Sequence, residues 1–402
     1  MLIDADAKVT FVCGDEGVLK TQYCDIPFSD NVIDFCSEIS RQLLSNKETK
    51  EYGDLTTFAF YCRRANLNVI RNQFSDSSKR LGWGLVLHIA PANIPINFAY
   101  SFLFGLLSGN GNIVRLPSRR YPQIDLFCRT VASVFDQPEY QQLNNANAFI
   151  RFDRESIFLK KYIQCFDALM VWGGDETVKN IRKLPRAPRS IEVSFSNRYS
   201  FALLSAKELL RLDKQGLEVL CNDFYNDTYL VDQNACSSPN LICWDGDKED
   251  IKKAKALFWH TFRAYLESRY DLNAVHAIDK KLKLLKYLDD YPLDLKITEY
   301  GAAITVATLH QISSFNHHLT GVFGLFFELE LGSIEDVLGV VNSKYQTLCY
   351  FGVCPKEIRS MVFEKRCKGI DRIVPIGSAL DIGTVWDGFD LIKTLSRVIT
   401  IK

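Results

Sequence analysis

The 402-residue sequence has no excess of charge of either sign and no long apolar run. Lysine plus arginine and aspartate plus glutamate number 48 each, and this balance argues against a general surface for nucleic acid. No apolar run reaches the roughly 20 residues that span a membrane. The opening residues, MLIDADAKVT, are acidic where a secretory signal is basic. We therefore expect a cytoplasmic protein without a membrane span and without a nucleic-acid partner.

The sequence also lacks paired cysteines, internal repeats and low-complexity tracts. Its twelve cysteines stand at irregular spacings without a CxxC pair, a pattern that favours reduced thiols over a disulfide framework or a zinc site. No cluster of metal-ligating residues is visible, so we expect no metal. A chain of this length is too long for one ordinary core, and two or three lobes are expected.

Strand and helix patterns alternate from Leu85 onward. LVLHIA is typical of a strand buried on both faces, and the loop PANIPIN follows it. FAYSFLFGLLSGN then predicts a helix and NIVRLPS a strand. The unit recurs in FDALMVWGG, a strand that runs into glycines, and DETVKNIRKL, a helix. This order predicts a doubly wound α/β sheet.

A second set of α/β patterns follows. RYSFALL predicts a strand, KELLRLDKQGLEVLCNDFYN a helix, and DKEDIKKAKALFWHTFRAYLESRY an amphipathic helix. GVFGLFFELEL and TLCYFGV predict strands, and a Ser333 and Asp336 capping pattern opens a helix between them. We expect a cofactor lobe over residues 1–205, a catalytic lobe over 206–380 and a C-terminal tail over 381–402 that packs on a neighbouring subunit.

Four segments carry a resemblance to a known family. The Pro-x-Asn-x-Pro loop after a strand, with its following helix and basic strand, resembles aldehyde dehydrogenases, as does DQNACSSPN, with Gln three residues before a cysteine. HIAPANIPINFAY, VRLPS, CSSPN and the closing RIVPIGSALDIGTVWDGFDLIKTLSR are similar to LuxC-type acyl-CoA reductases of that superfamily. The resemblance runs from about residue 80 to the C-terminus. It implies an aldehyde dehydrogenase-like α/β fold, with a Rossmann-type cofactor lobe and an α/β catalytic lobe.

The resemblance implies that Cys236 is the nucleophile. Reduction of an acyl thioester needs a group that takes the acyl chain and later releases it, and a thiolate does both. The polar turn CSSPN suits an accessible thiol, whereas most other cysteines stand in apolar or helical runs, as Cys165 and Cys349 do. From the residues alone, any one cysteine is more often structural.

Two further residues are candidates for the chemistry at Cys236. Asn93 matches the family's oxyanion donor, and its alternative role is to cap a turn between two prolines. Glu192 stands near the place of the carboxylate that activates water in hydrolytic aldehyde dehydrogenases, but the two glycines that normally follow it are missing. It is a candidate proton shuttle, or else an ordinary carboxylate at a strand edge.

The resemblance also implies a nicotinamide cofactor. Gly173 and Gly174 match a strand-glycine-helix element where backbone N–H groups hold a pyrophosphate, and a plain turn is the alternative. Arg115 stands at or beside the position that contacts the ribose, and Arg119 occupies about the place of a Glu that holds the ribose diol. Arginine favours a 2′-phosphate, which predicts NADPH, whereas a solvated basic patch is the alternative. Ser118 and Thr177, in the same two segments, complete the predicted cofactor residues.

The predicted function is therefore the NADPH-dependent reduction of an acyl-CoA or acyl-protein thioester to an aldehyde, through an acyl-Cys236 intermediate. An oxidising aldehyde dehydrogenase and a non-catalytic subunit that holds acyl groups are the alternatives. This sequence differs from the wider aldehyde dehydrogenase superfamily at Gly321, which stands where that superfamily has the Glu that would hold the nicotinamide ribose. An acyl-protein synthetase is the expected partner, and we expect a homo-oligomer.

Overall fold

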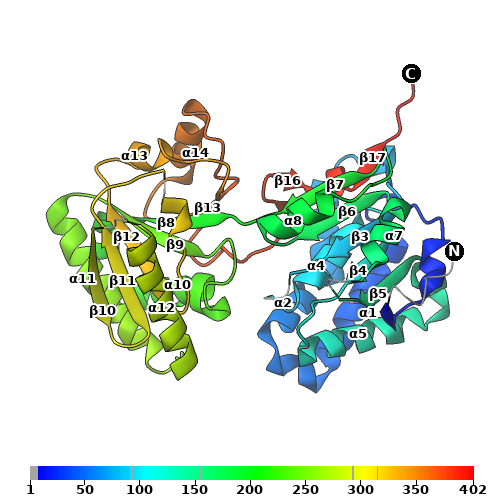
Figure 1. Ribbon diagram of the computed structural model, residues 1–402, viewed down its shortest axis with the longest axis horizontal. Helices are drawn as coiled ribbons and strands as arrows, with labels where there is room; N and C mark the ends of the chain where they lie inside the picture. Colours follow the sequence, from blue (N-terminus) through cyan, green and yellow to red (C-terminus); the bar gives the residue numbers. More distant parts are fainter. Residues whose placement is uncertain (1–7, 92–93, 154–155, 292–293, 315) are drawn as a thin grey trace. The chain divides into compact units, whose positions relative to one another are not determined.

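The computed structural model describes residues 8–91, 94–153, 156–291, 294–314 and 316–402. The chain divides into two units, of which the first comprises residues 1–196 and 389–402 and the second residues 197–388 (Figure 1). The division lies nine residues before the expected lobe boundary at residue 205, and β8 (Tyr199–Ser205) pairs with strands of the second sheet. The functions expected of the two lobes remain predictions.

The first unit is built on a six-stranded sheet with the order β1-β5-β4-β3-β6-β7. All neighbours are parallel except the edge pair of β1 and β5. After the edge strand β1, the chain enters the parallel part of the sheet at the central strand β3, moves outward through β4 and β5, and then returns to the other side of β3 for β6 and β7. This is the predicted doubly wound order, and its direction changes between β3 and β6. The strands are β1 (Thr10–Cys13), β3 (Leu85–Ile89), β4 (Gly111–Arg115), β5 (Asn147–Arg151), β6 (Ala168–Trp172) and β7 (Ile191–Phe195).

Helices cover both faces of this sheet. Side chains alternate between faces along a strand, so Leu85, Leu87 and Ile89 share one core with the helices α7 and α8. Val114 and Phe149 point to the opposite core, which α1, α4 and α5 close. The helices of this unit are α1 (Asp30–Ser45), α2 (Gly53–Tyr61), α3 (Arg64–Gln73), α4 (Asn97–Leu107), α5 (Pro122–Phe135), α6 (Gln141–Ala146), α7 (Phe158–Tyr162), α8 (Asp175–Arg182) and α15 (Leu391–Thr394).

The end of the chain belongs to the first unit. Strand β17 (Ser396–Val398) pairs antiparallel with β2 (Arg80–Gly82). Asn110 donates to the carbonyl oxygen of Leu395 at 2.8 Å, and the Trp83 indole donates to that of Thr394 at 3.0 Å. The tail is thus tied to its own chain, and its expected role in oligomerisation remains a prediction.

The second unit holds a seven-stranded sheet with the order β10-β11-β12-β9-β8-β13-β14. Only the edge pair of β10 and β11 is antiparallel among the strand pairs described. The strands besides β8 are β9 (Pro239–Asp245), β10 (Leu295–Tyr300), β11 (Ile304–Leu309), β12 (Leu325–Glu330), β13 (Tyr345–Phe351) and β14 (Arg372–Pro375). A short β15 (Val385–Trp386) precedes the return to the first unit at β16 (Phe389–Asp390).

The helices of the second unit again close two cores. Alternate residues of β8, with α9, α10 and α11, form one core, and the intervening residues, with α12, α13 and α14, form the other. The predicted helix over residues 207–226 is broken in two, because Asp213 caps a new helix through the backbone N–H of Gly216. The helices are α9 (Ala206–Leu210), α10 (Lys214–Thr228), α11 (Lys248–Leu266), α12 (Ala274–Asp290), α13 (Ile334–Leu338) and α14 (Pro355–Glu364). The capping box of Ser333 and Asp336 is present at the start of α13, as predicted.

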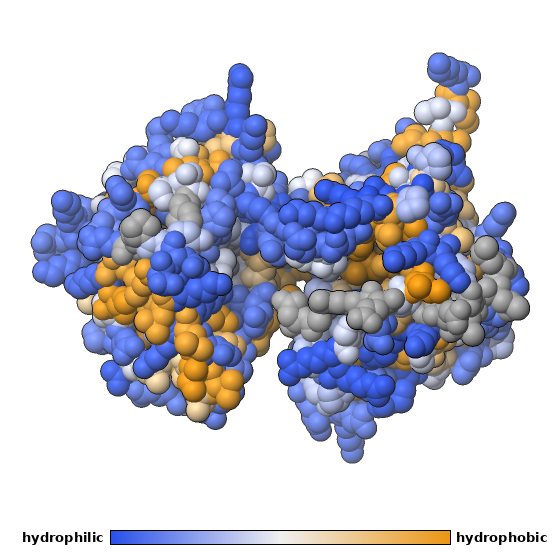
Figure 2. All heavy atoms as spheres, viewed as in Figure 1, coloured by the Kyte–Doolittle hydropathy of each residue, from blue (hydrophilic) through white to orange (hydrophobic). Residues whose placement is uncertain are grey.

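Helix α12 reverses the usual amphipathic pattern. Lys280 is 2% exposed on its inner face, whereas four aliphatic residues on its outer face are more than half exposed, namely Val275, Ile278, Leu282 and Leu285. Figure 2 shows apolar side chains gathered over this part of the second unit. Among the residues that the structure describes, no helix combines the length and apolar character needed to cross a membrane.

Candidate active site

Cys236 lies in a turn between the end of α10 and the start of β9. Strands β8, β9 and β13 run parallel there, and their registers pair Ser200 with Pro239 and Tyr199 with Tyr345. The cysteine therefore sits at the amino edge of the second sheet, opposite to the carboxyl edge at which open α/β sheets usually bind ligands. Its side chain is partly exposed.

Two residues of the DQNACSSPN segment hold this turn against the loop before β12. Gln233 donates to the carbonyl oxygen of Leu325 at 3.1 Å and accepts from the N–H of Gly324 at 2.8 Å. Asn240 accepts from the N–H of Gly321 at 2.7 Å. The glutamine three residues before the cysteine therefore fixes the fold of the turn.

The same loop explains the departure noted at Gly321. A Cβ on Gly321 would overlap the carbonyl oxygen of Leu325 and lie 2.8 Å from Nε2 of Gln233. A glutamate cannot occupy this position without moving the loop. Any contacts that hold a nicotinamide ribose must therefore come from other residues.

Ser200 anchors the backbone of Cys236 to the sheet. Its hydroxyl donates to the carbonyl oxygen of Cys236 at 2.7 Å and accepts from the N–H of Thr347 at 3.2 Å. Strand β8 thus connects the cysteine turn to β13. Because both partners are main-chain atoms, the position of the Cys236 backbone is determined by the sheet itself.

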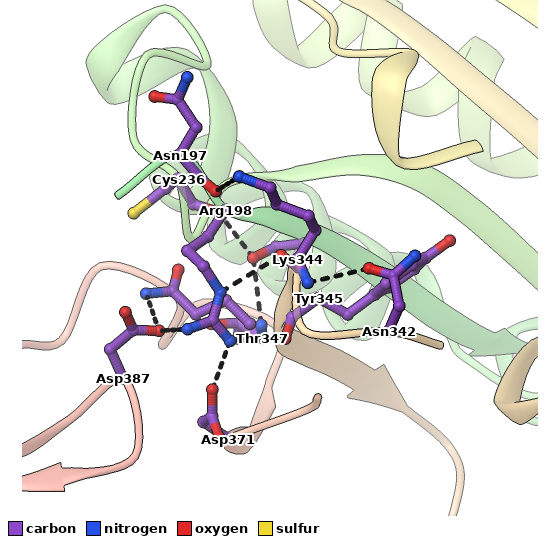
Figure 3. Close-up of polar contacts among 11 residues, drawn as sticks. Asn197, Arg198, Cys236, Asn342, Lys344, Tyr345, Thr347, Asp371 and Asp387 are labelled. Carbon is purple, nitrogen blue, oxygen red and sulfur yellow. Dashed lines mark hydrogen bonds and ion pairs between the residues drawn. The ribbon is translucent and has the colours of Figure 1, made fainter. Parts of the chain in front are cut away.

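Arg198 is the centre of a buried polar network beside Cys236 (Figure 3). Its guanidinium is 12% exposed, forms an ion pair with Asp387 at 2.5 Å, and forms a second ion pair with Asp371. It also donates to the carbonyl oxygen of Tyr345 at 2.7 Å. Guanidinium groups present several donors in a fixed plane, and here they join β8, β13 and the closing segment of the unit.

Gln346 connects this network to the sulfur. Its side-chain nitrogen donates to Oδ1 of Asp387 at 3.0 Å. The same amide is near enough to Cys236 to lower the pKa of the thiol. The residue is 1% exposed, and its Oε1 has no hydrogen-bond partner among the described residues. Arg198, Asp387 and Gln346 were not expected from the sequence. The only sequence signal for any of them is that Asp387 belongs to the closing segment of the LuxC resemblance.

The environment of Cys236 keeps its thiol protonated near neutral pH. Burial, assisted by the negative charge of Asp387, raises the pKa of Cys236 to about 11. The amide of Gln346 and the positive charge of Arg198 act in the opposite direction on this pKa. One carboxylate thus opposes ionisation of the sulfur, whereas one amide and one guanidinium favour it.

Glu192 lies in the first unit, on β7, and is held by ion pairs. Its carboxylate contacts Arg182 at 2.8 Å and Arg186 at 2.5 Å, and it accepts a hydrogen bond from Ser194. Burial acts to raise the pKa of Glu192, but Ser194 and the two guanidinium groups lower it below its ordinary value. A carboxylate of this kind is a weak base, and its contacts are those of a structural ion pair.

The predicted cofactor residues share one edge of the first sheet. Arg115 ends β4 directly opposite Ile89 of β3, and Val171 of β6 flanks Ile89 on the other side. Gly173 and Gly174 follow β6 and lead into α8. Adjacent strands are about 4.8 Å apart, so the loops after β4 and β6 lie about 10 Å apart at the point where the strand order reverses.

The individual side chains at this edge differ in their freedom to move. Arg115 donates to the carbonyl oxygen of Phe152 at 3.1 Å and to Ser118 at 3.2 Å, and its guanidinium lies over the Phe152 ring. Arg119 is exposed and lies over Tyr121. Thr177 lies next to Gly173, where a Cβ would be 3.0 Å from its methyl group. A larger residue than glycine would be crowded at this turn.

Asn93 lies outside the described residues.

Within the described parts of the chain, no group of three or more His, Cys, Asp and Glu residues is arranged to hold a metal ion. All twelve cysteines are free, and Cys24, Cys165 and Cys354 are more exposed than Cys236. Exposure alone therefore does not single out Cys236, whereas its network of polar contacts does.

Comparisons with known proteins agree with this geometry. The long-chain acyl-protein thioester reductase of Vibrio harveyi is 25% identical over 177 residues, which are 43% of this chain and 34% of that protein. The match thus spans about a third of the relative's length. Aldehyde dehydrogenase 21 of Physcomitrella patens, solved with the product succinate, aligns over 92% of this chain and 86% of its own, with a TM-score of 0.67 and 13% identity. Glyceraldehyde-3-phosphate dehydrogenase GapN of Methanocaldococcus jannaschii, solved with NADP, aligns over 92% and 89%, with a TM-score of 0.63 and 14% identity.

These similarities establish the aldehyde dehydrogenase fold that the sequence predicted. The profile of the LuxC acyl-CoA reductases matches residues 61–398, which include the first sheet apart from β1, the whole second sheet and the turn of Cys236. The chain belongs to the LuxC family of acyl-CoA reductases.

Proposed function

We propose that the protein reduces an acyl thioester to an aldehyde with NADPH, and that Cys236 carries the acyl group between the two half-reactions. The observation that carries the proposal is the partly exposed thiol of Cys236 with a donor network built around it, in a chain of the LuxC family. The Vibrio harveyi relative is a long-chain acyl-protein thioester reductase, and this similarity supports an acyl thioester as substrate.

In the first half-reaction, Cys236 gives up its thiol proton and its sulfur attacks the acyl carbon of the donor thioester. A carbon–sulfur bond forms to Cys236, and the donor thiolate leaves and takes up a proton. Asn93 and the backbone N–H of Cys236 are the proposed donors to the developing oxyanion, and for Asn93 this role rests on the sequence. Such donors are typically worth about 3 to 4 kcal/mol each in the transition state.

In the second half-reaction, a bound nicotinamide cofactor would supply a hydride to the acyl carbon. The bond to Cys236 then breaks, the sulfur recovers its electron pair, and the aldehyde leaves. Gln346 is suited to assist here, because a donor to sulfur stabilises the thiolate as it departs. The polar residues around Cys236 therefore serve both when the thiolate attacks and when it leaves.

The carboxyl edge of the first sheet fits the proposed cofactor. Gly173 and Gly174 begin the helix α8 at the point where strand order reverses, and that is where open α/β sheets bind dinucleotides. Arg115, with Ser118 as its partner, and the exposed Arg119 supply positive charge on the neighbouring loop, which favours NADPH. Thr177 lies beside Gly173 on the first turn of the helix.

Glu192 distinguishes the proposed reductase from an oxidising enzyme. Its role as a proton shuttle remains a prediction, but its two ion pairs and lowered pKa favour a structural role. Without a base to activate water, an acyl-enzyme persists until hydride or another thiol arrives. Such an enzyme could receive acyl groups from an acyl-protein synthetase, and a homo-oligomer remains our expectation for its assembly.

The nucleophile is tested by acyl labelling. Wild type, Cys236→Ala and Cys354→Ala are incubated with a radiolabelled acyl-CoA and analysed on a denaturing gel before and after hydroxylamine treatment. We expect label in the wild type and in Cys354→Ala, an exposed-thiol control, and none in Cys236→Ala. Hydroxylamine-sensitive label of wild-type intensity on Cys236→Ala would remove Cys236 from the mechanism.

A further inference from the structure

We propose that Gln346 is a catalytic donor to the Cys236 sulfur, and that Asp387, held by Arg198, is the positioning residue that fixes the orientation of the Gln346 amide. This inference rests on the proposed function, because it assigns the groups that prepare the same thiol for acyl transfer. It starts from the contacts of a residue that is fully inside the protein.

The polarity of each contact follows from the chemistry of the groups. A guanidinium can only donate hydrogen bonds, and an ionised carboxylate can only accept them. Arg198 contacts Asp387 at 2.5 Å, which offsets the cost of burying that carboxylate. Oδ1 of Asp387 accepts from the side-chain nitrogen of Gln346 at 3.0 Å.

The hydrogen bond to the Asp387 carboxylate prevents the Gln346 amide from flipping. If the amide reversed, its oxygen would face the carboxylate of Asp387, and two acceptors would repel each other. The NH₂ group has two hydrogens, so that while one serves Asp387 the other is free for the sulfur. Arg198 and Asp387 thus select the orientation in which Gln346 favours a thiolate.

The backbone of the site is fixed independently of this network. Ser200 holds the carbonyl oxygen of Cys236 and the N–H of Thr347, the residue after Gln346. Cys236 and Gln346 are therefore kept side by side even when a side chain is replaced. Asp387 has a φ of 52°, a left-handed conformation that asparagine tolerates well. Asp387→Asn is for this reason expected to fold.

The test is the pH dependence of Cys236 alkylation by iodoacetamide, measured on the Cys236 peptide by mass spectrometry so that the other thiols do not contribute. Wild type is compared with Gln346→Met, Gln346→Glu and Asp387→Asn. Asp371→Asn is the matched control, because it removes the other carboxylate partner of Arg198 without contacting Gln346. Thermal unfolding of each variant confirms that it is folded.

We expect Gln346→Met and Gln346→Glu to move the alkylation midpoint to higher pH by about one unit, since both remove the donor. Asp387→Asn is expected to move the midpoint to lower pH, because a negative charge is lost, and yet to slow acyl transfer by about tenfold, because the amide is no longer locked. Asp371→Asn should move the midpoint far less than either change.

An unchanged midpoint in both folded Gln346 variants would overturn the donor role. An acyl-transfer rate in Asp387→Asn equal to that of the wild type would overturn the role of Asp387 as a positioning residue. Alkylation needs neither acyl substrate nor cofactor, so the result for the Gln346 variants is independent of the proposed function. The acyl-transfer rate of Asp387→Asn is compared with that of the wild type, and absence of acyl transfer in the wild type would instead mark a failure of the proposed function.

Discussion

At the scale of single residues, the sequence predicted a nucleophile, Cys236, but not the polar groups that surround it. Cys236 stands in a motif whose local spacing is visible in the chain. Arg198, Gln346 and Asp387 are separated from it by up to 151 residues of sequence, and only the pairing of β8 with β13 and the return of the closing segment bring them together. No local pattern of polarity or spacing encodes such a contact.

Glu192 is the opposite case, because its predicted role rests on a local match and its contacts favour a structural role. The side chain of Glu192 is 9% exposed and paired with two arginines, of which Arg186 is itself largely buried. Its folded-state pKa is lowered, so its contribution to stability is present above its unfolded pKa and is lost as the pH falls.

Glu192→Gln is therefore expected to destabilise the protein at pH 7 by about 1 kcal/mol, since the exposed Arg182 and the partly buried Arg186 lose a charged acceptor. The destabilisation should begin to shrink as the pH falls below the unfolded pKa of about 4.3, and it should be lost as the pH falls through the lower folded pKa. Chemical denaturation at pH 7 and at the lowest pH at which the wild type stays folded provides the comparison. A variant with wild-type stability but a strongly reduced rate of acyl-enzyme hydrolysis would instead assign Glu192 to catalysis.

At the scale of elements, periodicity located most of the strands and helices that build the sites. LVLHIA, NIVRLPS and FDALMVWGG correspond to β3, β4 and β6, and DETVKNIRKL to α8. The helix α12 and the antiparallel edge strand β10 were not expected. Four aliphatic residues of α12 face outward, whereas Lys280 and Leu284 face inward, so the apolar pattern of this helix does not predict which side faces the core.

The loops after β4 and β6 lead to a prediction about cofactor choice. Arg119→Ala should lower the ratio of kcat/KM for NADPH to that for NADH at least tenfold, because a charge-assisted contact to a phosphate contributes about 1.5 to 3 kcal/mol. Its thermal midpoint should not change, because Arg119 is exposed. Arg115→Ala should lower both the ratio and the thermal midpoint, since Arg115 also holds Phe152 and Ser118.

Kinetics with both cofactors, together with thermal unfolding, separate these two arginines. Equal use of NADPH and NADH by the wild type would remove the argument for a 2′-phosphate site. The acidic residues Asp175 and Glu176 in the first turn of α8 make this comparison informative, because they disfavour additional negative charge at the same helix end.

At the scale of the whole molecule, the proposed reaction divides its tasks between two units. The predicted cofactor residues lie at the carboxyl edge of the first sheet, and Cys236 lies at the amino edge of the second. A general rule for α/β sheets predicted the first location but not the second. The expected lobe boundary at residue 205 and the observed division after residue 196 lie on either side of β8, because a buried strand pattern does not state which sheet the strand joins.

The central claim is that Cys236 carries an acyl group that waits for hydride, and a single-turnover chase tests it most directly. The acyl-enzyme is formed with acyl-CoA, freed of excess substrate by desalting, and divided into buffer alone and buffer with NADPH. We predict aldehyde in an amount equal to the acyl-enzyme when NADPH is present, and only slow release of fatty acid when it is absent. Rapid release of fatty acid in buffer alone, or an acyl-enzyme that NADPH leaves unchanged, would contradict the account.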